Sequence, residues 1–202
     1  MIYILIIILI VLFLSVRTCF VYSESLYIES AVDNNHYLIR RGKNKTDEFL
    51  KESANTLAEI NNRVIQLIDH LDKKYKNDDT KMFFIKKLKE NYSSSVLSEA
   101  AIDKRYTTYT IDKRDMHICL RTRDDEERLY DINLLMYVVL HELAHLCNYT
   151  PGGHPIQGHG IEFKKIFRLL VQEGINIGIY KYENYTSNPK NYCGMVISSS
   201  IV

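Results

Sequence analysis

The sequence has no large excess of either charge. Its 26 Lys and Arg residues stand against 25 Asp and Glu, which gives a formal net charge of +1. Proteins that bind nucleic acid through electrostatic attraction usually carry a clear basic surplus. The charge balance therefore gives no reason to expect nucleic acid, or an acidic substrate, as a partner.

Cysteine is also scarce, and its spacing lacks the C-x-x-C pairs of metal-binding motifs. The four residues are far apart in the sequence: Cys19, Cys119, Cys147 and Cys193. This spacing argues against a structural zinc ribbon and against a dense disulfide framework. We expect reduced thiols in a domain that faces the cytosol.

A chain of 202 residues with 46% hydrophobic residues is long enough for one sizeable core. Charge is absent from the first 16 residues, and Arg17 is the first charged side chain. With residues 18–22 included, this segment reaches the length needed to span a bilayer as one helix. The sequence thus predicts a transmembrane anchor at 1–22, a juxtamembrane linker at 23–45 and a globular domain at 46–202.

A cleaved signal peptide is the alternative for the N-terminal segment, since Val21-Tyr22-Ser23 resembles a cleavage site. No Lys or Arg precedes the apolar run, and that run is long for a signal peptide, so we favour an uncleaved single-pass membrane anchor. Arg17 lies on the C-terminal side of the run, which favours a cytoplasmic location for the domain that follows.

The most informative motif is H-E-L-A-H, in which His141, Glu142 and His145 have the H-E-x-x-H spacing. Residues four apart lie on the same face of an α-helix, so both imidazoles can bind one metal ion. The carboxylate beside them is then in reach of a water on that metal, as zinc-dependent hydrolysis requires. The flanking residues are apolar nearly all round, and a buried helix would not tolerate these polar groups without a metal or hydrogen bonds.

A third metal ligand is expected downstream of this helix, which must end near Asn148 because T-P-G-G follows. His159 begins a second amphipathic helix that ends near Gly174, and we favour it as the third ligand. His154 in the intervening loop is the rival candidate, and Glu162 or Glu173 would be carboxylate alternatives. Of these, a histidine anchored on a packed helix is held most reliably.

The remaining sequence indicates a mixture of helices and strands. Apolar spacing predicts amphipathic helices from about Thr46 to Lys73 and over 80–91, and β-branched residues predict a hairpin over 105–122. We expect its second strand, from His117 to Arg121, at the sheet edge, where it could bind an extended peptide. Alternation of apolar residues predicts another strand over 175–179.

H-E-L-A-H followed by G-H-G-I-E-F strongly resembles the SprT-like and WLM zinc metallopeptidases. The upstream H-I-C-L-R-T and L-L-M-Y-V-V-L look similar to the WLM pattern, and the resemblance covers about residues 106–170. It implies a small α+β zincin fold in which Zn²⁺ is bound by His141, His145 and His159, with Glu142 as the catalytic base. Together with an N-terminal anchor and the terminal N-P-x-x-Y-C-G-M, it resembles membrane-bound WLM proteins of large DNA viruses.

The expected function is therefore zinc-dependent hydrolysis of a protein or peptide substrate, in which Glu142 takes a proton from zinc-activated water. Tyr185 or Tyr192 is a candidate to stabilise the oxyanion. Two alternatives stay open: a non-catalytic zinc-binding membrane or virion structural protein, and a protease that acts on DNA-associated proteins. The second conflicts with the neutral charge and with the lack of a tail beyond the catalytic domain.

Overall fold

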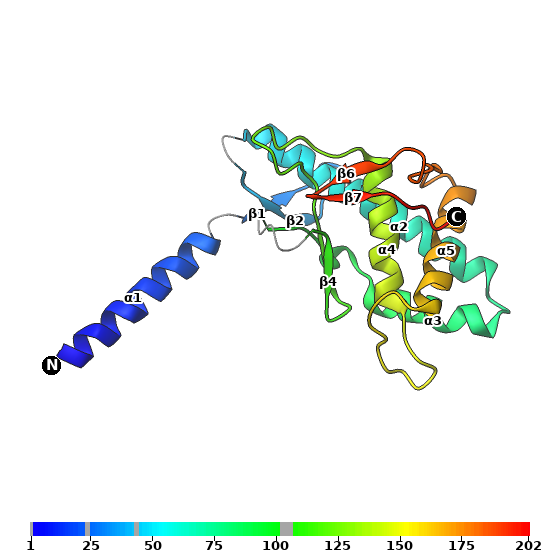
Figure 1. Ribbon diagram of the computed structural model, residues 1–202, viewed down its shortest axis with the longest axis horizontal. Coiled ribbons are helices and arrows are strands. Elements are labelled where there is room, and N and C mark those ends of the chain that lie inside the picture. The colour runs from blue at the N-terminus through cyan, green and yellow to red at the C-terminus, as the bar shows by residue number, and fades with distance from the viewer. Residues whose placement is uncertain (1, 23–24, 43–44, 102–106) are drawn as a thin grey trace.

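The computed structural model describes residues 2–22, 25–42, 45–101 and 107–202, and it shows an α+β fold (Figure 1). The helices are α1 (Ile2–Tyr22), α2 (Asp47–Lys74), α3 (Asp79–Asn91), α4 (Ile132–Cys147) and α5 (Ile161–Asn176), and a short 3-10 helix covers Ser94–Val96. The strands are β1 (Ser25–Glu29), β2 (His36–Arg40), β3 (Leu97–Glu99), β4 (Tyr109–Ile111), β5 (Asp115–Ile118), β6 (Lys190–Tyr192) and β7 (Met195–Ile197).

Five of these strands form one mixed sheet in the order β1-β2-β3-β5-β4. β3 pairs in parallel with β2 and β5, whereas β1 and β4 pair antiparallel with their neighbours. The edge of the sheet on the side of β5 is therefore β4. This corrects the expectation that His117 to Arg121 forms an edge strand, because β5 lies between β3 and β4 and its backbone groups on both sides are used.

The helices predicted from apolar spacing are confirmed. Thr46 caps α2, its side chain accepting a hydrogen bond from the Phe49 backbone, and the buried residues of α2 recur every three or four positions. α3 follows after a cap at Asp78. α4 lies at the centre of the domain and packs against α2, α3 and α5, which explains why its sequence is apolar on nearly every side.

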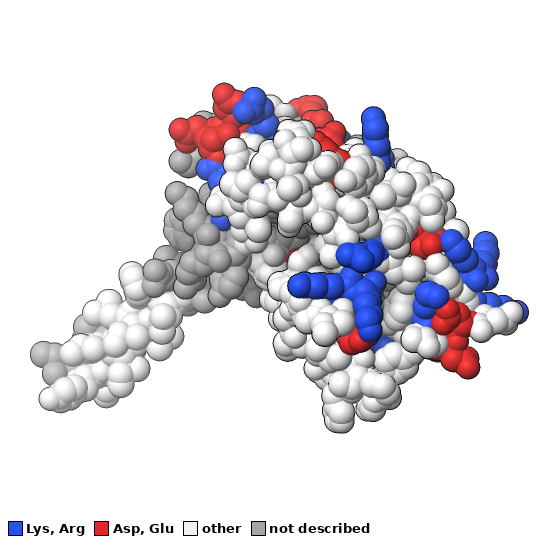
Figure 2. Space-filling model, turned by 45° about the vertical axis from the view of Figure 1, so that its right-hand side comes forward, with Lys and Arg blue, Asp and Glu red and all other residues white. Residues whose placement is uncertain are grey.

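α1 projects away from the rest of the fold, and its described side chains from Tyr3 to Leu14 are largely exposed and uncharged (Figures 1 and 2). Within the described parts of the chain, none of the helices meets the combined length and hydropathy expected of a membrane-crossing segment. The transmembrane anchor predicted over residues 1–22 therefore has no support from the structure.

The linker predicted over residues 23–45 is wrong for its described part, because β1 and β2 lie there and belong to the main sheet. Tyr37 and Ile39 of β2 are buried in the core, on alternate positions of the strand. The domain therefore begins before residue 46. Each of these strands has only five residues with polar residues at its ends, which is too short a pattern to reveal its period in the sequence.

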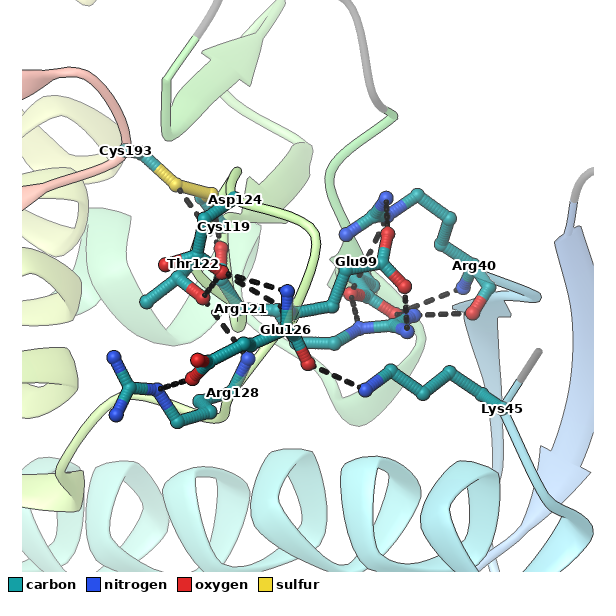
Figure 3. A network of polar contacts seen from close by, with 11 residues as sticks. Arg40, Lys45, Glu99, Cys119, Arg121, Thr122, Asp124, Glu126, Arg128 and Cys193 are labelled. Carbon is teal, nitrogen blue, oxygen red and sulfur yellow. Dashed lines mark hydrogen bonds and ion pairs between the residues drawn. A yellow bond between two sulfur atoms is a disulfide. The ribbon is translucent and has the colours of Figure 1, made fainter. Parts of the chain in front are cut away.

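A network of buried charged side chains joins β2, β3 and the segment after β5 (Figure 3). The Arg121 guanidinium donates to both carboxylate oxygens of Glu99 at 2.6 Å, and Arg40 donates to Glu127 at 2.7 Å. Gly42 beside it has a φ of +73°, and a Cβ there would lie 2.5 Å from a Glu127 oxygen. Only glycine fits this position without moving the network.

A disulfide between Cys119 and Cys193 lies next to this network (Figure 3), and Cys147 is buried as a free thiol. The prediction of reduced thiols is therefore wrong for this pair. The Cα atoms are 6.4 Å apart, a normal separation for a disulfide, but the residues are 74 positions apart in sequence. Spacing in the sequence cannot indicate such a pairing, because only the fold brings the two residues together.

The C-terminal region also differs from the prediction. α5 continues through Asn176 and is followed by turns, so no strand covers residues 175–179. The alternating isoleucines there belong to the end of the helix and the chain reversal after it. Instead, β6 and β7 form a separate two-stranded hairpin further along, which the sequence did not predict.

Candidate metal centre

α4 positions two of the candidate metal ligands. Asp131 caps the helix by accepting hydrogen bonds from the backbone N–H groups of Asn133 and Leu134, and the helix ends at Cys147. The imidazoles of His141 and His145 therefore lie one turn apart, with ring centroids separated by 5.0 Å. The helix geometry thus places both rings on one face, as the motif spacing predicts.

The third imidazole is that of His159, two residues before α5. Its Nε2 atom lies 3.0 Å from Nε2 of His141 and 3.1 Å from Nε2 of His145. Three nitrogen atoms bound to one tetrahedral zinc ion at the usual bond length lie about 3.3 Å from one another. The spacing of the three nitrogen atoms therefore fits a single Zn²⁺ ion.

The loop after α4 brings His159 back to the helix. Asn148 and Ile156 are joined by a backbone hydrogen bond of 3.0 Å, and residues 149 and 155 form an isolated β-bridge. His154 lies at the exposed end of this loop and is outside the three-histidine group.

The two glutamates considered as alternative ligands are also outside the group. Glu162 is exposed and pairs with Lys165 at 2.8 Å. Glu173 is buried against α2, where it accepts hydrogen bonds from Lys74 and Tyr75 and lies 2.6 Å from His70 Nε2. Its carboxylate thus links α5 to α2.

The environment of the histidines favours the neutral imidazoles that metal binding requires. Burial, together with the neighbouring imidazoles, lowers the pKa of His141 to about 3. Burial also lowers the pKa of His145 to about 4, with smaller contributions from His159 and from the Lys113 ammonium. At neutral pH both rings therefore have a nitrogen lone pair free to bind a metal without first losing a proton.

Glu142 is 6% exposed and faces the same cleft as the histidines. The Thr110 hydroxyl donates to its Oε2 atom at 2.8 Å. Burial raises the pKa of Glu142 to about 7, although the hydrogen bond from Thr110 acts in the opposite direction. A carboxylate with a pKa near the working pH suits proton transfer, and a cation at the histidines would favour its charged form.

Side chains from other elements complete the surroundings. Phe163 of α5 packs against all three imidazoles, with ring centroids 4.9 Å from His141, 4.3 Å from His145 and 4.7 Å from His159. The ring excludes water from one side of the group. The apolar face of α5 predicted that Phe163 is buried, but not that it contacts the histidines.

Two further residues were missed by the sequence analysis, and both come from the hairpin of β4 and β5. Thr110 contacts Glu142, as described above. Lys113 donates hydrogen bonds to the backbone carbonyls of His145 and Ile156, so that it ties the hairpin turn to the end of α4 and to the loop before His159. The alternation of Y-T-T-Y-T-I predicts that Thr108 and Thr110 share a face, which was the available signal.

The two tyrosines considered for oxyanion stabilisation have different positions. Tyr192 lines the cleft, and its hydroxyl is hydrogen bonded to the Thr108 side chain. Tyr185 is buried against Tyr137, with ring centroids 4.8 Å apart, and it is not among the residues that line the cleft. Of the two, only Tyr192 is in contact with the candidate site.

Comparison with known proteins identifies viral relatives. The uncharacterized protein R325 of Acanthamoeba polyphaga mimivirus is 35% identical over 193 residues, which cover 95% of this chain and 90% of the relative. The uncharacterized protein 136R of Invertebrate iridescent virus 6 is 25% identical over 181 residues, which cover 85% and 92%. The uncharacterized protein 042R of Invertebrate iridescent virus 3 is 36% identical over 103 residues, which cover 50% and 58%.

No protein-family model and no solved structure matches the chain. The resemblance to the SprT-like and WLM metallopeptidases therefore stays a prediction. The identity with the mimivirus relative, which extends over nearly all of both chains, shows that this chain belongs to the same family as mimivirus protein R325.

Proposed function

We propose that this protein is a zinc-dependent metallopeptidase with a zincin-like catalytic domain. The observation that carries the proposal is the convergence of three imidazole nitrogens at 3.0 and 3.1 Å, with the carboxylate of Glu142 in the same cleft. Three neutral nitrogen ligands suit Zn²⁺ and leave a coordination position for water or substrate. A zinc ion at such a site acidifies water and polarises a carbonyl group.

The residues of the chain have separate roles in this mechanism. His141, His145 and His159 would hold the metal. Glu142 accepts a proton from the attacking water and passes it to the departing amine, and Thr110 fixes the orientation of this carboxylate. Phe163 packs against the three imidazoles and keeps water away from one side of them.

A purely structural zinc site is the competing function. Such a site is usually closed by four protein ligands, whereas the group found among the described residues contains three. The buried carboxylate of Glu142 lies in the same cleft but is not a member of this group. Both observations favour catalysis.

The test compares the purified protein with its Glu142→Gln variant. The zinc content is measured by elemental analysis and the cleavage of unfolded casein by release of peptides. We expect about one zinc per chain in both proteins and a rate lower by roughly 10²- to 10⁴-fold in the variant, the usual contribution of a general base.

Removal of zinc with a chelator should abolish cleavage by the original protein, and added zinc should restore it. A variant that cleaves casein at the original rate would remove Glu142 from the mechanism. A protein that binds one zinc per chain and cleaves nothing would favour the structural role instead.

A further inference from the structure

The C-terminal hairpin contributes a wall to the cleft that contains the histidines. This cleft has a volume of about 660 Å³. Its lining includes Tyr109 and Thr110 of β4 and the three histidines, and also the whole of β7 with the residues that follow it, as far as Ile201. In Figure 1, β7 is the strand of the hairpin that lies on the side of β4. The edge strand of the main sheet and a second strand thus both border the candidate metal centre.

The geometry of the hairpin shows which backbone groups of β7 are available. The two residues of the turn, Cys193 and Gly194, have φ angles of +48° and +83°, as in a type I′ turn. The strand pair next to this turn, Tyr192 with Met195, is of the hydrogen-bonded kind. The following pair, Asn191 with Val196, is therefore of the other kind. The backbone N–H and C=O of Val196 point away from β6, toward the open edge of β7.

Several contacts fix this wall in place. The disulfide to Cys119 holds the turn, and the backbone N–H of Cys193 donates to the Tyr130 hydroxyl at 2.8 Å. Beyond β7, Tyr137 donates to the Ser199 carbonyl at 3.1 Å and Arg168 donates to the Ile201 carbonyl at 3.0 Å. An edge that is already ordered loses little entropy when another strand pairs with it.

The chemistry of the cleft indicates which side chains would be accepted. Apart from the histidines, its charged lining residues are two acids and two bases: Asp112, Glu142, Lys113 and Lys164. The open strand itself has exposed apolar side chains, with Met195 46% and Val196 55% exposed. Figure 2 shows small groups of charged side chains, several of which contain both acidic and basic residues, with uncharged surface between the groups. Because acidic and basic residues are equal in number in its lining, the cleft would not select a ligand of either charge.

We propose that the open edge of β7 binds the backbone of an unfolded protein segment in an extended conformation, with uncharged side chains against the cleft. The substrate strand then pairs with the C-terminal hairpin while its scissile bond lies at the histidines. This inference rests on the proposed peptidase function, whose substrate class it names. It assigns to the hairpin a role in substrate binding, beyond its contribution to the fold.

Two proline substitutions in the same hairpin test this role. Val196→Pro removes the backbone N–H that points to the open edge of β7. Asn191→Pro removes the equivalent N–H on the far edge, at an exposed residue of β6 that does not line the cleft. Both positions belong to the strand pair that makes no hydrogen bonds within the hairpin, so both variants should keep the hairpin intact.

Binding is measured in the Glu142→Gln background, so that the probe is not consumed. The probe is fluorescently labelled lactalbumin that has been reduced and carboxymethylated, which keeps it unfolded, and fluorescence anisotropy gives the dissociation constant. We expect Val196→Pro to weaken binding roughly two- to tenfold, the usual effect of one lost hydrogen bond. Asn191→Pro should bind the probe as tightly as the parent.

Equal affinities in the two proline variants, or a parent that does not bind the unfolded probe, would overturn the proposal. Circular dichroism and zinc content, measured for each variant, separate this result from a failure of the proposed function. A chain that binds the probe through β7 but holds no zinc would contradict the peptidase function and leave the binding edge in place. The KM for cleavage is measured in the same two proline variants with Glu142 retained. Equal KM values in chains that hold zinc and cleave peptides would contradict only the binding edge.

Discussion

Two clusters of polar side chains in this protein differ in whether their members can satisfy one another. In the network around Arg121, the guanidinium and carboxylate groups neutralise one another, and Arg121 and Glu99 are almost entirely buried. In the histidine group, three nitrogen atoms of the same kind face one another, and burial lowers the pKa values of His141 and His145. The first cluster satisfies its own charges, whereas the second would be satisfied by a cation.

This difference separates a structural polar cluster from a candidate functional one. Buried charges are tolerated when they are paired, and breaking the pair leaves one of them without compensation. In a neutral imidazole each Nε2 atom is either a donor or an acceptor, so three Nε2 atoms that face one another at about 3 Å cannot form a hydrogen bond in every pair. The predictions below follow from this comparison, beginning with the largest expected effect.

Removing a metal ligand should have the largest effect. His159→Ala should lose stoichiometric zinc, with an affinity lower by more than about a hundredfold, because even residues that only support a ligand cost 10- to 100-fold. His154→Ala, in the exposed part of the same loop, is the matched control and should keep its zinc. Elemental analysis after gel filtration measures the zinc content of both variants. Unchanged zinc in His159→Ala would assign the third ligand to another residue.

Removing one partner from the network around Arg121 should destabilise the fold without changing the zinc content. Glu99→Ala leaves the Arg121 guanidinium, which is 0% exposed, without its main partner. We expect the free energy of unfolding to fall by about 3–5 kcal/mol in urea titrations. Glu126→Ala breaks the exposed ion pair with Arg128 and should change the free energy of unfolding by less than about 1 kcal/mol. Similar values for the two variants would contradict the structural role of the network.

Removing the Thr110 hydroxyl should have a smaller effect, which is limited to the rate of catalysis. Thr110→Val keeps the branched shape of the side chain but removes the hydrogen bond to Glu142. We expect kcat to fall roughly tenfold with KM and zinc content unchanged, as for other residues that orient an active group. Thr110→Ser keeps the hydroxyl and should recover most of the rate. Equal rates for the Val and Ser variants would show that the hydrogen bond does not position the base.

The smallest expected effect concerns Glu173, which is paired within the fold and lies outside the histidine group. Burial favours its neutral form, but hydrogen bonds from Lys74, His70 and Tyr75 outweigh this effect and lower its pKa to about 2. Because the folded-state pKa is below the unfolded value, the carboxylate stabilises the fold above about pH 4.5, and this stabilisation is lost as the pH falls toward 2.

Glu173→Gln should therefore be less stable than the original protein at pH 7, and the difference should shrink as the pH is lowered from about 5 to 3. Urea unfolding at several pH values measures this difference. Glu162→Gln, in the exposed first turn of the same helix, is the control and should show no such dependence. A difference that stays constant with pH would mean that the Glu173 carboxylate is not stabilised in its charged form.

Most of the helices could be predicted because their signals are local. Thr46 and Asp131 cap α2 and α4. The apolar residues of α2 repeat with the helical period, and α4 carries a long apolar run that ends before T-P-G-G. The strands were harder, since β3, β4, β6 and β7 have three residues each, and such short segments show no period. The continuation of α5 through Asn176 was missed because isoleucines at every second position also fit a strand.

The candidate site was predictable where one helix or one motif determined it. His141, Glu142 and His145 follow from their spacing. The position of His159 at a second helix favoured it over His154 without excluding the latter. Thr110, Lys113 and the residues of β7 reach the cleft from strands whose pairing is set by distant segments. Whether β4 or β5 formed the sheet edge depended on β3, which occupies the other side of β5.

The sequence alone determined that two histidines and a glutamate share one buried helix, because a helix relates residues four apart by its own geometry. The tertiary structure decided which third imidazole joins them, which strand edges border the cleft and which cysteines pair. These features depend on contacts between segments far apart in the chain. Such contacts arise from the packing of the whole core and leave no local pattern in the sequence.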